Sequence, residues 1–342
     1  MPIGFLEFSE ARHHPHGTHR LCKASGVASL RPVTLVVAAL IALAGARADR
    51  GAAAPSARAA GARFRDCAGC PEMIVAPVGT FTIGSPPGEA GRGGDEGPQR
   101  EIRITQPFAV GRYEVTRRQY EAFLRATGHP VSGNCMTDRR KPGTWALDPQ
   151  TNFRDPGFPQ SGTHPAACVT WYDAKAFIAW LNARTGGGYR LLTEAEWEYL
   201  ARAGSTSAYP WGARAKDGCR YMNGFDRVIV RKKGDLYKGE AVSFADCSDG
   251  YLNTAPVGSL RPNAFGIYDM IGNVGEWVED CSTPSYSLMQ SNGSMHGGDC
   301  SKRIVRGGSW GTQPRQLRSA ERIRNSPADV DDSIGIRVAK TL

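Results

Sequence analysis

The sequence predicts an α+β domain with little regular secondary structure, on three observations. The 342 residues include 41 glycines and 22 prolines, and so many chain breakers shorten helices and strands. Good helix caps occur at only a few places in the middle of the chain. Short apolar runs bounded by turn residues follow. Together these observations favour one large domain whose rigidity depends on disulfides, buried tryptophans and candidate metal sites.

Three helices are expected, each with a threonine at its N-cap. In the last two, an acidic residue stands three positions after the threonine, as in a capping box, and glycine follows the last turn. These features predict helices over Thr116–Thr127, Trp171–Arg184 and Thr193–Ala203. Residues 73–85 predict two short strands around Pro77, and residues beyond Gly204 predict turns, short strands and loops as far as Val338.

The first 66 residues are expected to lie outside the folded domain. Val33–Ala44 is apolar, follows an arginine and precedes Ala46-Arg47-Ala48, as in a secretory signal. The apolar run is too short to span a bilayer comfortably, and the alternative, a buried helix, lacks caps and a polar face. We therefore interpret residues 1–48 as a signal peptide region and 49–66 as a flexible linker. The domain is expected over residues 67–342, periplasmic or secreted, with no integral membrane segment after signal cleavage.

The cysteines indicate a disulfide framework. Nine are present, and Cys22 falls within residues 1–48. The even set that remains is read as disulfides in an exported protein. Spacing suggests the pairs Cys135–Cys168, Cys219–Cys247 and Cys281–Cys300. Cys67 and Cys70 are expected to form a local disulfide, since they lie at the edge of a linker and not between a strand and a helix.

The charge pattern argues against a nucleic-acid partner. The formal net charge is +9. Residues 1–48 carry an excess of basic residues, so the rest of the chain has about +6. Basic residues are scattered, and the one tight cluster, Arg231-Lys232-Lys233, has no interleaved aromatic residues. This cluster is interpreted as a solvated loop.

A series of distinctive segments runs through residues 71–340. In chain order they are Glu72–Phe81, Tyr113–Thr116, Val169–Trp171, Arg190–Glu198, Tyr209–Gly212, Asn263–Gly266, Gly272–Trp277 and Arg306–Trp310. The ordered series resembles the formylglycine-generating enzyme (sulfatase-modifying factor) family. The resemblance implies that family's irregular α+β fold, which is related to C-type lectin-like domains. Trp197, Trp211 and Trp277 are expected in the core, with substrate contact as the alternative.

Two oxygen-rich clusters are candidate calcium sites. Calcium takes carboxylates, amide oxygens and backbone carbonyls from turns. The resemblance implies a first site at Asn223, Gly224, Asp249 and Tyr251 and a second at Ile271, Asn273, Val274 and Glu276, with backbone carbonyls supplied by Gly224, Tyr251, Ile271 and Val274. Without the resemblance each cluster reads as an ordinary turn. The expected role of the calcium is structural, because it would hold loops together.

The chain lacks the cysteine pair that performs the family's chemistry. Family members that oxidise a substrate cysteine to formylglycine resemble one another in holding copper(I) between two cysteines after a Gly-Gly-Ser stretch. Here that stretch is Gly307-Gly308-Ser309, but the matching positions are Thr312 and Leu317, and residues 311–342 contain no cysteine. Neither side chain is a soft ligand. Copper is therefore not expected, and the chain is interpreted as a divergent member.

The segment after the motif suggests a binding groove in place of the oxidase site. Its candidate residues are Ser309, Trp310, Arg315, Arg318 and Arg322. Arginines pair with carboxylate or sulfate, so the expected ligand is a peptide or a small anion. The alternative is a strand with solvated and packed arginines.

Two functions stay open. The favoured one is an exported, calcium-stabilised binding or accessory module. The alternative is a sulfatase-maturation oxidoreductase that converts a substrate-protein cysteine to formylglycine through an atypical site. A hydrolase is excluded, since no histidine follows the Gly-x-Ser-x-Gly match at residues 307–311.

Overall fold

The first sheet joins strands from the two ends of the domain. The computed structural model describes residues 58–138, 145–233 and 243–342, which belong to one unit, Pro55–Leu342. In these residues the sheet has the order β1 (Arg63–Phe64), β2 (Met73–Val75), β5 (Phe108–Gly111), β13 (Val338–Thr341) and β8 (Tyr189–Leu191). All neighbours are antiparallel. The last strand thus lies between β5 and β8 and ties the C-terminus into the fold.

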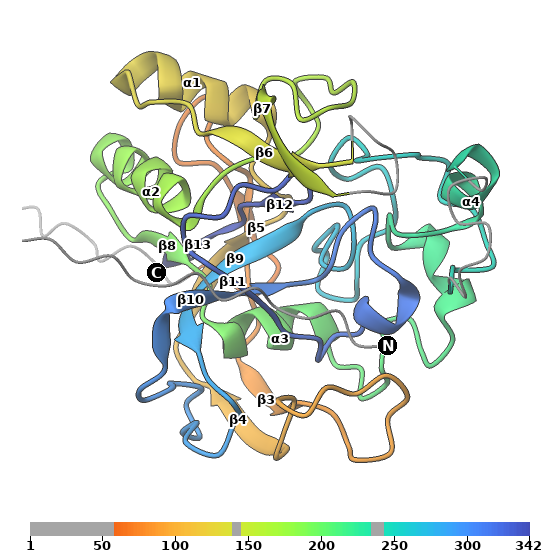
Figure 1. Ribbon diagram of the computed structural model, residues 1–342. Coiled ribbons are helices and arrows are strands. Elements are labelled where there is room, and N and C mark those ends of the chain that lie inside the picture. Colours follow the sequence, from red (N-terminus) through yellow and green to blue (C-terminus); the bar gives the residue numbers. More distant parts are fainter. Residues whose placement is uncertain (1–57, 139–144, 234–242) are drawn as a thin grey trace, which may run out of the picture. The chain divides into compact units, whose positions relative to one another are not determined.

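The second sheet lies across the centre of the view in Figure 1 and carries several site residues. Its order is β11 (Ile323–Asn325), β10 (Asp299–Arg306), β9 (Gly275–Ser282) and β12 (Ile334–Gly335). Only the pairing of β12 with β9 is parallel among the described strands of this sheet. Two further antiparallel hairpins are β3 (Gly79–Ile83) with β4 (Arg100–Ile104), and β6 (Gly133–Thr137) with β7 (Ala146–Asn152).

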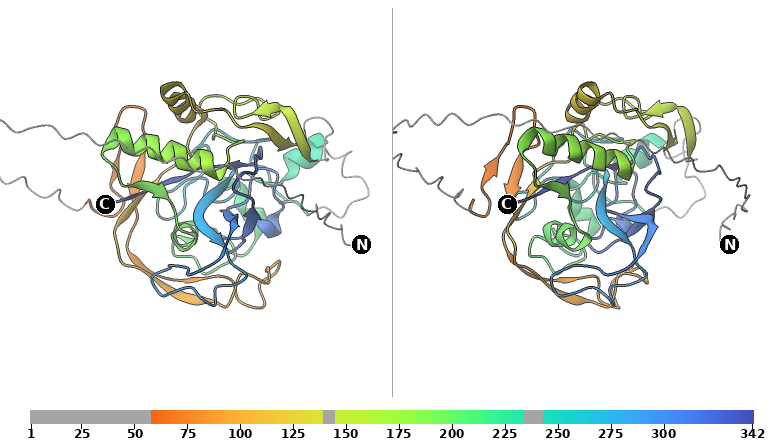
Figure 2. Two further views of the ribbon diagram at one scale, coloured as in Figure 1. Left: turned by 60° about the vertical axis from the view of Figure 1, so that its left-hand side comes forward. Right: turned by 90° about the vertical axis from the view of Figure 1, so that its left-hand side faces the viewer.

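The three expected helices are confirmed as α1 (Arg117–Thr127), α2 (Trp171–Thr185) and α3 (Glu194–Arg202). Each threonine N-cap accepts a hydrogen bond from the amide three positions on, and the side chain at that position returns one to the cap. α1 and α2 contact each other and lie on the same side of the domain in both views of Figure 2. α3 instead packs against β3, β9 and β10.

The region beyond Gly204 contains more regular structure than expected. Helix α4 (Arg227–Lys233) and the 3₁₀ helices η1 (Ala215–Arg220) and η3 (Pro314–Gln316) interrupt the loops. The basic cluster at residues 231–233 ends α4 and is therefore helical, although Arg231 and Lys232 are exposed as expected. Strands β9 and β10 run eight residues each and were expected to be short.

Four disulfides confirm the three pairs that the spacing suggested, Cys135–Cys168, Cys219–Cys247 and Cys281–Cys300, and the expected local pair Cys67–Cys70. Three of them close loops of 19 to 33 residues. Such cross-links stabilise a fold mainly by restricting its unfolded state, which suits a chain rich in loops.

The ordered domain begins before Cys67. Arg63 and Phe64 form β1, and the amide of Gly61 donates to the carbonyl of Val75, so part of the segment expected as a linker belongs to the sheet. The expected signal region, 1–48, lies outside the described residues. Within those residues, no helix combines the length and the apolar character needed to cross a bilayer.

Candidate functional site

Thr312 and Leu317, the two positions that the sequence resemblance matches to copper-binding cysteines, come together above Gly308. A methyl group placed on Gly308 would lie 3.0 Å from Cγ2 of Thr312 and 2.8 Å from Cδ2 of Leu317. Both side-chain tips therefore approach the same point. Leu317 is fully buried in the core, and its Cδ1 also blocks any side chain at Gly224. The structure thus fills this point with hydrocarbon and not with sulfur, the ligand type that copper(I) prefers.

Ser309 and Thr312 form a closed hydrogen-bonded turn. The Thr312 hydroxyl lies 3.0 Å from the Ser309 hydroxyl and accepts the Ser309 amide at 2.9 Å, while the Thr312 amide donates back to the Ser309 carbonyl at 3.0 Å. The Thr312 carbonyl accepts the amide of Phe225. A nucleophilic hydroxyl needs an adjacent base, and these two hydroxyls hydrogen-bond to each other. We therefore assign the turn a structural role.

Arg318 does not face a groove. It is buried, and its guanidinium contacts both carboxylate oxygens of Glu96, at 2.6 and 2.7 Å, together with Glu89 and Glu321. Burial alone would raise the pKa of Glu96, but hydrogen bonds from Arg318, Ser85 and Gly93 lower it to about 2. Arg318 is therefore fully paired inside the protein, and the expectation that it binds an external anion is wrong.

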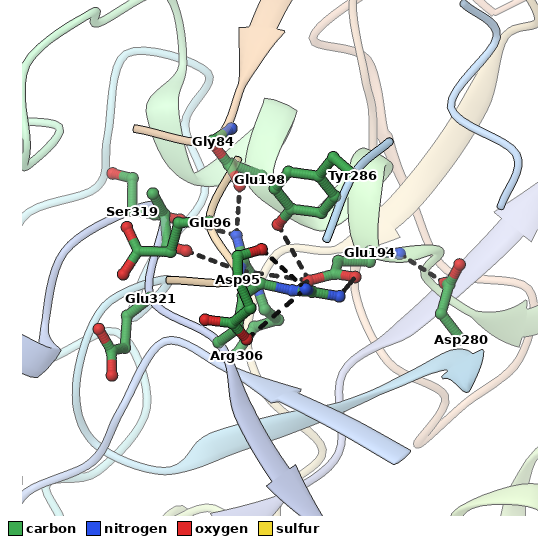
Figure 3. Close-up of polar contacts among 12 residues, drawn as sticks. Gly84, Asp95, Glu96, Glu194, Glu198, Asp280, Tyr286, Arg306, Ser319 and Glu321 are labelled. Atoms are coloured by element: carbon green, nitrogen blue, oxygen red, sulfur yellow. Dashed lines mark hydrogen bonds and ion pairs between the residues drawn. The ribbon is translucent and has the colours of Figure 1, made fainter. Parts of the chain in front are cut away.

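Arg322 is also buried and shares the carboxylate of Glu194 with Arg306. Figure 3 shows Arg306 beside Glu194 and Glu198. Arg322 forms a two-point contact with Glu194, at 2.7 and 2.9 Å. Arg306 contacts Glu198 at 2.5 Å and Glu194 at 3.4 Å. Burial would raise the pKa of Glu194, but the charges of Arg322 and Arg306 bring it below its ordinary value. The expected ligand groove is thus corrected at Arg322 as well.

The remaining two groove candidates lie in different surroundings. Trp310 is buried and packs against Phe158, at 5.4 Å between ring centroids, and against Trp145, at 5.9 Å. Arg315 is exposed on η3. The five residues therefore do not form one groove.

The first calcium cluster is brought together by the fold. The Asp249 carboxylate accepts the amides of Gly224, at 3.0 Å, and Tyr251, at 2.7 Å, so two distant segments meet there. Burial raises the pKa of Asp249 to about 7, with the nearby Asp226 adding to the rise. No ion pair to Lys or Arg reaches Asp249 in the part of the chain that the structure describes. A carboxylate in this setting fits a bound cation.

The second calcium cluster has other partners. Glu276 is buried and accepts Nε1 of Trp197 at 2.7 Å on one oxygen and the Arg337 guanidinium at 2.7 Å on the other. The side-chain oxygen of Asn273 accepts the amide of Ala255. A guanidinium already supplies the positive charge that calcium was expected to bring. The prediction that Glu276 is a calcium ligand is therefore not supported by its contacts.

The two clusters are nevertheless neighbours. The amide of Asn273 donates to the carbonyl of Asn223 at 2.8 Å. Gly272 has a φ of +82°, and a Cβ there would lie 2.0 Å from the same carbonyl oxygen, so only glycine allows this approach. Ile271 and Val274 are buried on either side of this junction. The buried loop that contains these two residues therefore holds the backbone of Asn223 in place.

Sequence reasoning placed all three motif tryptophans in the core, and one of them is not there. Trp197 and Trp277 are fully buried, as expected. Trp211 is partly exposed and stacks between Tyr209 and Tyr221. The basic residues of this region carried no motif signal, so the surface around Trp211 was missed.

The fold and the site define a disulfide-linked α+β domain of the sulfatase-modifying type. The chain belongs to the family described as the sulfatase-modifying factor enzyme 1-like domain, whose pattern matches residues 60–342.

Related proteins differ in what their names say about activity. The chain is 30% identical to a formylglycine-generating enzyme of Thermomonospora curvata over 78% of this chain and 92% of the relative. It is 29% identical to the inactive C-alpha-formylglycine-generating enzyme 2 of Mus musculus, over 79% and 86%. Among solved structures, PvdO from Pseudomonas aeruginosa is 38% identical with a TM-score of 0.69, over 84% of this chain and all of that one.

Proposed function

We propose that this protein is an exported, calcium-stabilised binding or accessory module that does not oxidise cysteine to formylglycine. The observation that carries the proposal is the packing of Thr312 and Leu317 above Gly308. Copper(I) needs soft thiolate ligands, and a hydroxyl and an isobutyl group cannot replace them. The inactive mouse relative supports the same reading, because the family includes members named as inactive.

The disulfides support export. Four cross-links form from all the cysteines of residues 67–342. Disulfides persist in oxidising compartments and are rare in a reducing cytosol. Together with the apolar segment Val33–Ala44, they favour a periplasmic or secreted location.

The absence of oxidase activity is testable with a peptide that carries a Cys-x-Pro-x-Arg sequence. After incubation of the folded protein with copper(I), oxygen and this peptide, we expect no decrease in peptide mass of the kind that accompanies conversion of cysteine to an aldehyde. The formylglycine-generating enzyme of Thermomonospora curvata serves as the positive control. Aldehyde formation by the present protein at a rate above that of copper alone would reject the proposal in favour of an atypical oxidase.

Calcium is proposed at the first cluster only. Asn223 and Asp249 supply side-chain oxygens, and the carbonyls of Gly224 and Tyr251 lie on the same two turns. Among the described residues, no group of three or more His, Cys, Asp or Glu side chains is arranged to hold a metal. A cation bound here therefore has to use amide and backbone oxygens as well, which calcium accepts.

Calcium is expected to stabilise the fold through Asp249. At a calcium concentration about 100 times the dissociation constant, the free energy of unfolding should rise by about 2.7 kcal/mol, and chelation should reverse the rise. Denaturant unfolding with and without calcium measures this change. Asp249→Asn should abolish it. The matched control is Asp246→Asn, since Asp246 lies on the same loop as Asp249 and is exposed. Its carboxylate pairs with Arg227 of α4. An equal calcium response in the wild type and Asp249→Asn would contradict the assignment.

A further inference from the structure

Three stacked aromatic rings run from the segment between Thr312 and Leu317 to the surface. Tyr209 and Trp211 stack with ring centroids 5.0 Å apart and planes 11° apart, and Trp211 and Tyr221 stack at 6.1 Å and 9°. The hydroxyl of the buried Tyr209 donates to the carbonyl of Pro314, at 2.9 Å, between Thr312 and Leu317. Trp211 and Tyr221, the outer two rings, are partly exposed.

The outer rings are held rigidly. The indole Nε1 of Trp211 donates to the carbonyl of Arg214 at 3.1 Å. A Cβ on Gly218 would lie 2.4 Å from the same indole, so η1 can pack against Trp211 only because glycine stands there. Tyr221 follows η1 directly, and the disulfide Cys219–Cys247 anchors η1 to the next loop. Because these rings are already fixed, ligand binding costs little additional side-chain entropy, which favours affinity.

Trp211 and Tyr221 line two separate clefts. One cleft, of about 330 Å³, has apolar walls that include Pro210, Pro262 and Ile267. The other, of about 520 Å³, extends along η1 as far as Ser248. Each volume falls in the range of small-ligand sites. The two rings therefore form a ridge that borders both clefts.

Basic side chains flank the ridge. Arg261 lines the first cleft, and Lys216 and Arg220 line the second. All three are exposed, and within residues 58–138, 145–233 and 243–342 none of them is ion-paired. The amide of Arg261 donates to the carbonyl of Arg220 at 2.7 Å, which fixes the spacing of the two backbones. The nearby Asp217 is neutralised by Arg214 at 2.8 Å.

We propose that this ridge and its two clefts bind an acidic oligosaccharide, such as one built from uronic acids. The flat CH face of a sugar ring packs against the exposed parts of the Trp211 and Tyr221 rings and the neighbouring prolines, while carboxylates on successive rings pair with Arg261 in one cleft and Arg220 or Lys216 in the other. A small anion with one charge cannot reach both clefts. The inference rests on the proposed binding function and gives it a site and a ligand class.

The test is a titration of the whole folded protein with a galacturonic-acid tetrasaccharide at about 0.15 M ionic strength, followed by calorimetry and tryptophan fluorescence. We expect a dissociation constant at least about tenfold lower than for neutral maltotetraose or a tetraglutamate peptide. Arg261→Ala should weaken binding about tenfold, because a charge-assisted hydrogen bond is lost. Trp211→Ala should remove the fluorescence change.

The matched control is Arg118→Ala. Arg118 is an exposed arginine on α1 that, among the described side chains, is also without an ion pair. The inference is overturned if the tetrasaccharide does not bind, if tetraglutamate binds as tightly, or if Arg118→Ala weakens binding as much as Arg261→Ala does. Failure of this test leaves the peptide-oxidation test unaffected, and aldehyde formation would reject the proposed function whatever the sugar result. The two failures are therefore distinguishable.

Discussion

Replacing Arg306 with methionine is expected to lower the free energy of unfolding by about 3–5 kcal/mol. Arg306 is fully buried on β10, and it donates to Glu198 and Glu194 and to the carbonyls of Ser319 and Ala320. Methionine fills a similar volume but leaves one oxygen of Glu198 without a cationic partner, while Arg202 still pairs with the other oxygen. A buried carboxylate that has lost its hydration and one of its two cationic partners destabilises the folded state.

The measurement is denaturant unfolding at neutral pH with the disulfides intact. The control is Arg324→Met on the neighbouring strand β11, because Arg324 pairs with Asp95 but its side chain is 38% exposed. That change should cost less than about 1 kcal/mol. Equal costs at Arg306 and Arg324 would contradict the view that the network is held by buried charge pairing.

The double variant Thr312→Cys, Leu317→Cys is expected to bind one copper(I) ion per chain, where the wild type binds none at this position. Both side chains already approach the same point above Gly308, so two sulfur atoms placed there have a common space to share. Paired thiolates are the ligands that copper(I) prefers. The change in copper affinity should therefore be the largest effect of any substitution in this segment.

Anaerobic competition with a chromophoric copper(I) chelator measures the affinity, and X-ray absorption reports the number of sulfur ligands. The two single variants are the controls, and each should bind copper far more weakly. Leu317 lies in the core, so its shortening costs about 2–5 kcal/mol, and circular dichroism must show that the fold persists. A folded double variant whose copper affinity equals that of the wild type would show that the two positions do not converge as described.

Local features of the fold were predictable from the sequence because their causes are local. The helices that begin after Thr116, Thr170 and Thr193 are set by caps within three residues of each start. The disulfides were also predictable, since an even set of cysteines with short spacings leaves natural pairs. The α4 helix was missed because its seven residues follow no strong periodic pattern.

The candidate site was predicted less well, because burial depends on distant partners. The sequence predicted that Arg318 and Arg322 bind a ligand. In the structure they pair with the carboxylates of Glu96 and Glu194, which are 222 and 128 positions away in the chain. The same holds for Glu276, whose charge partner, Arg337, lies 61 positions further on. No local pattern distinguishes an arginine that faces solvent from one that meets a buried glutamate.

The sequence by itself determined the family, the disulfide pairs, the three capped helices and the lack of thiols at Thr312 and Leu317, since each of these depends on residue identity and short spacing. Only the tertiary structure decided that Arg306, Arg318 and Arg322 neutralise buried carboxylates and that Trp211 lies at the surface between two clefts. The physical reason is that the environment of a charged or aromatic side chain is set by whichever segments pack around it, and these segments are remote in sequence.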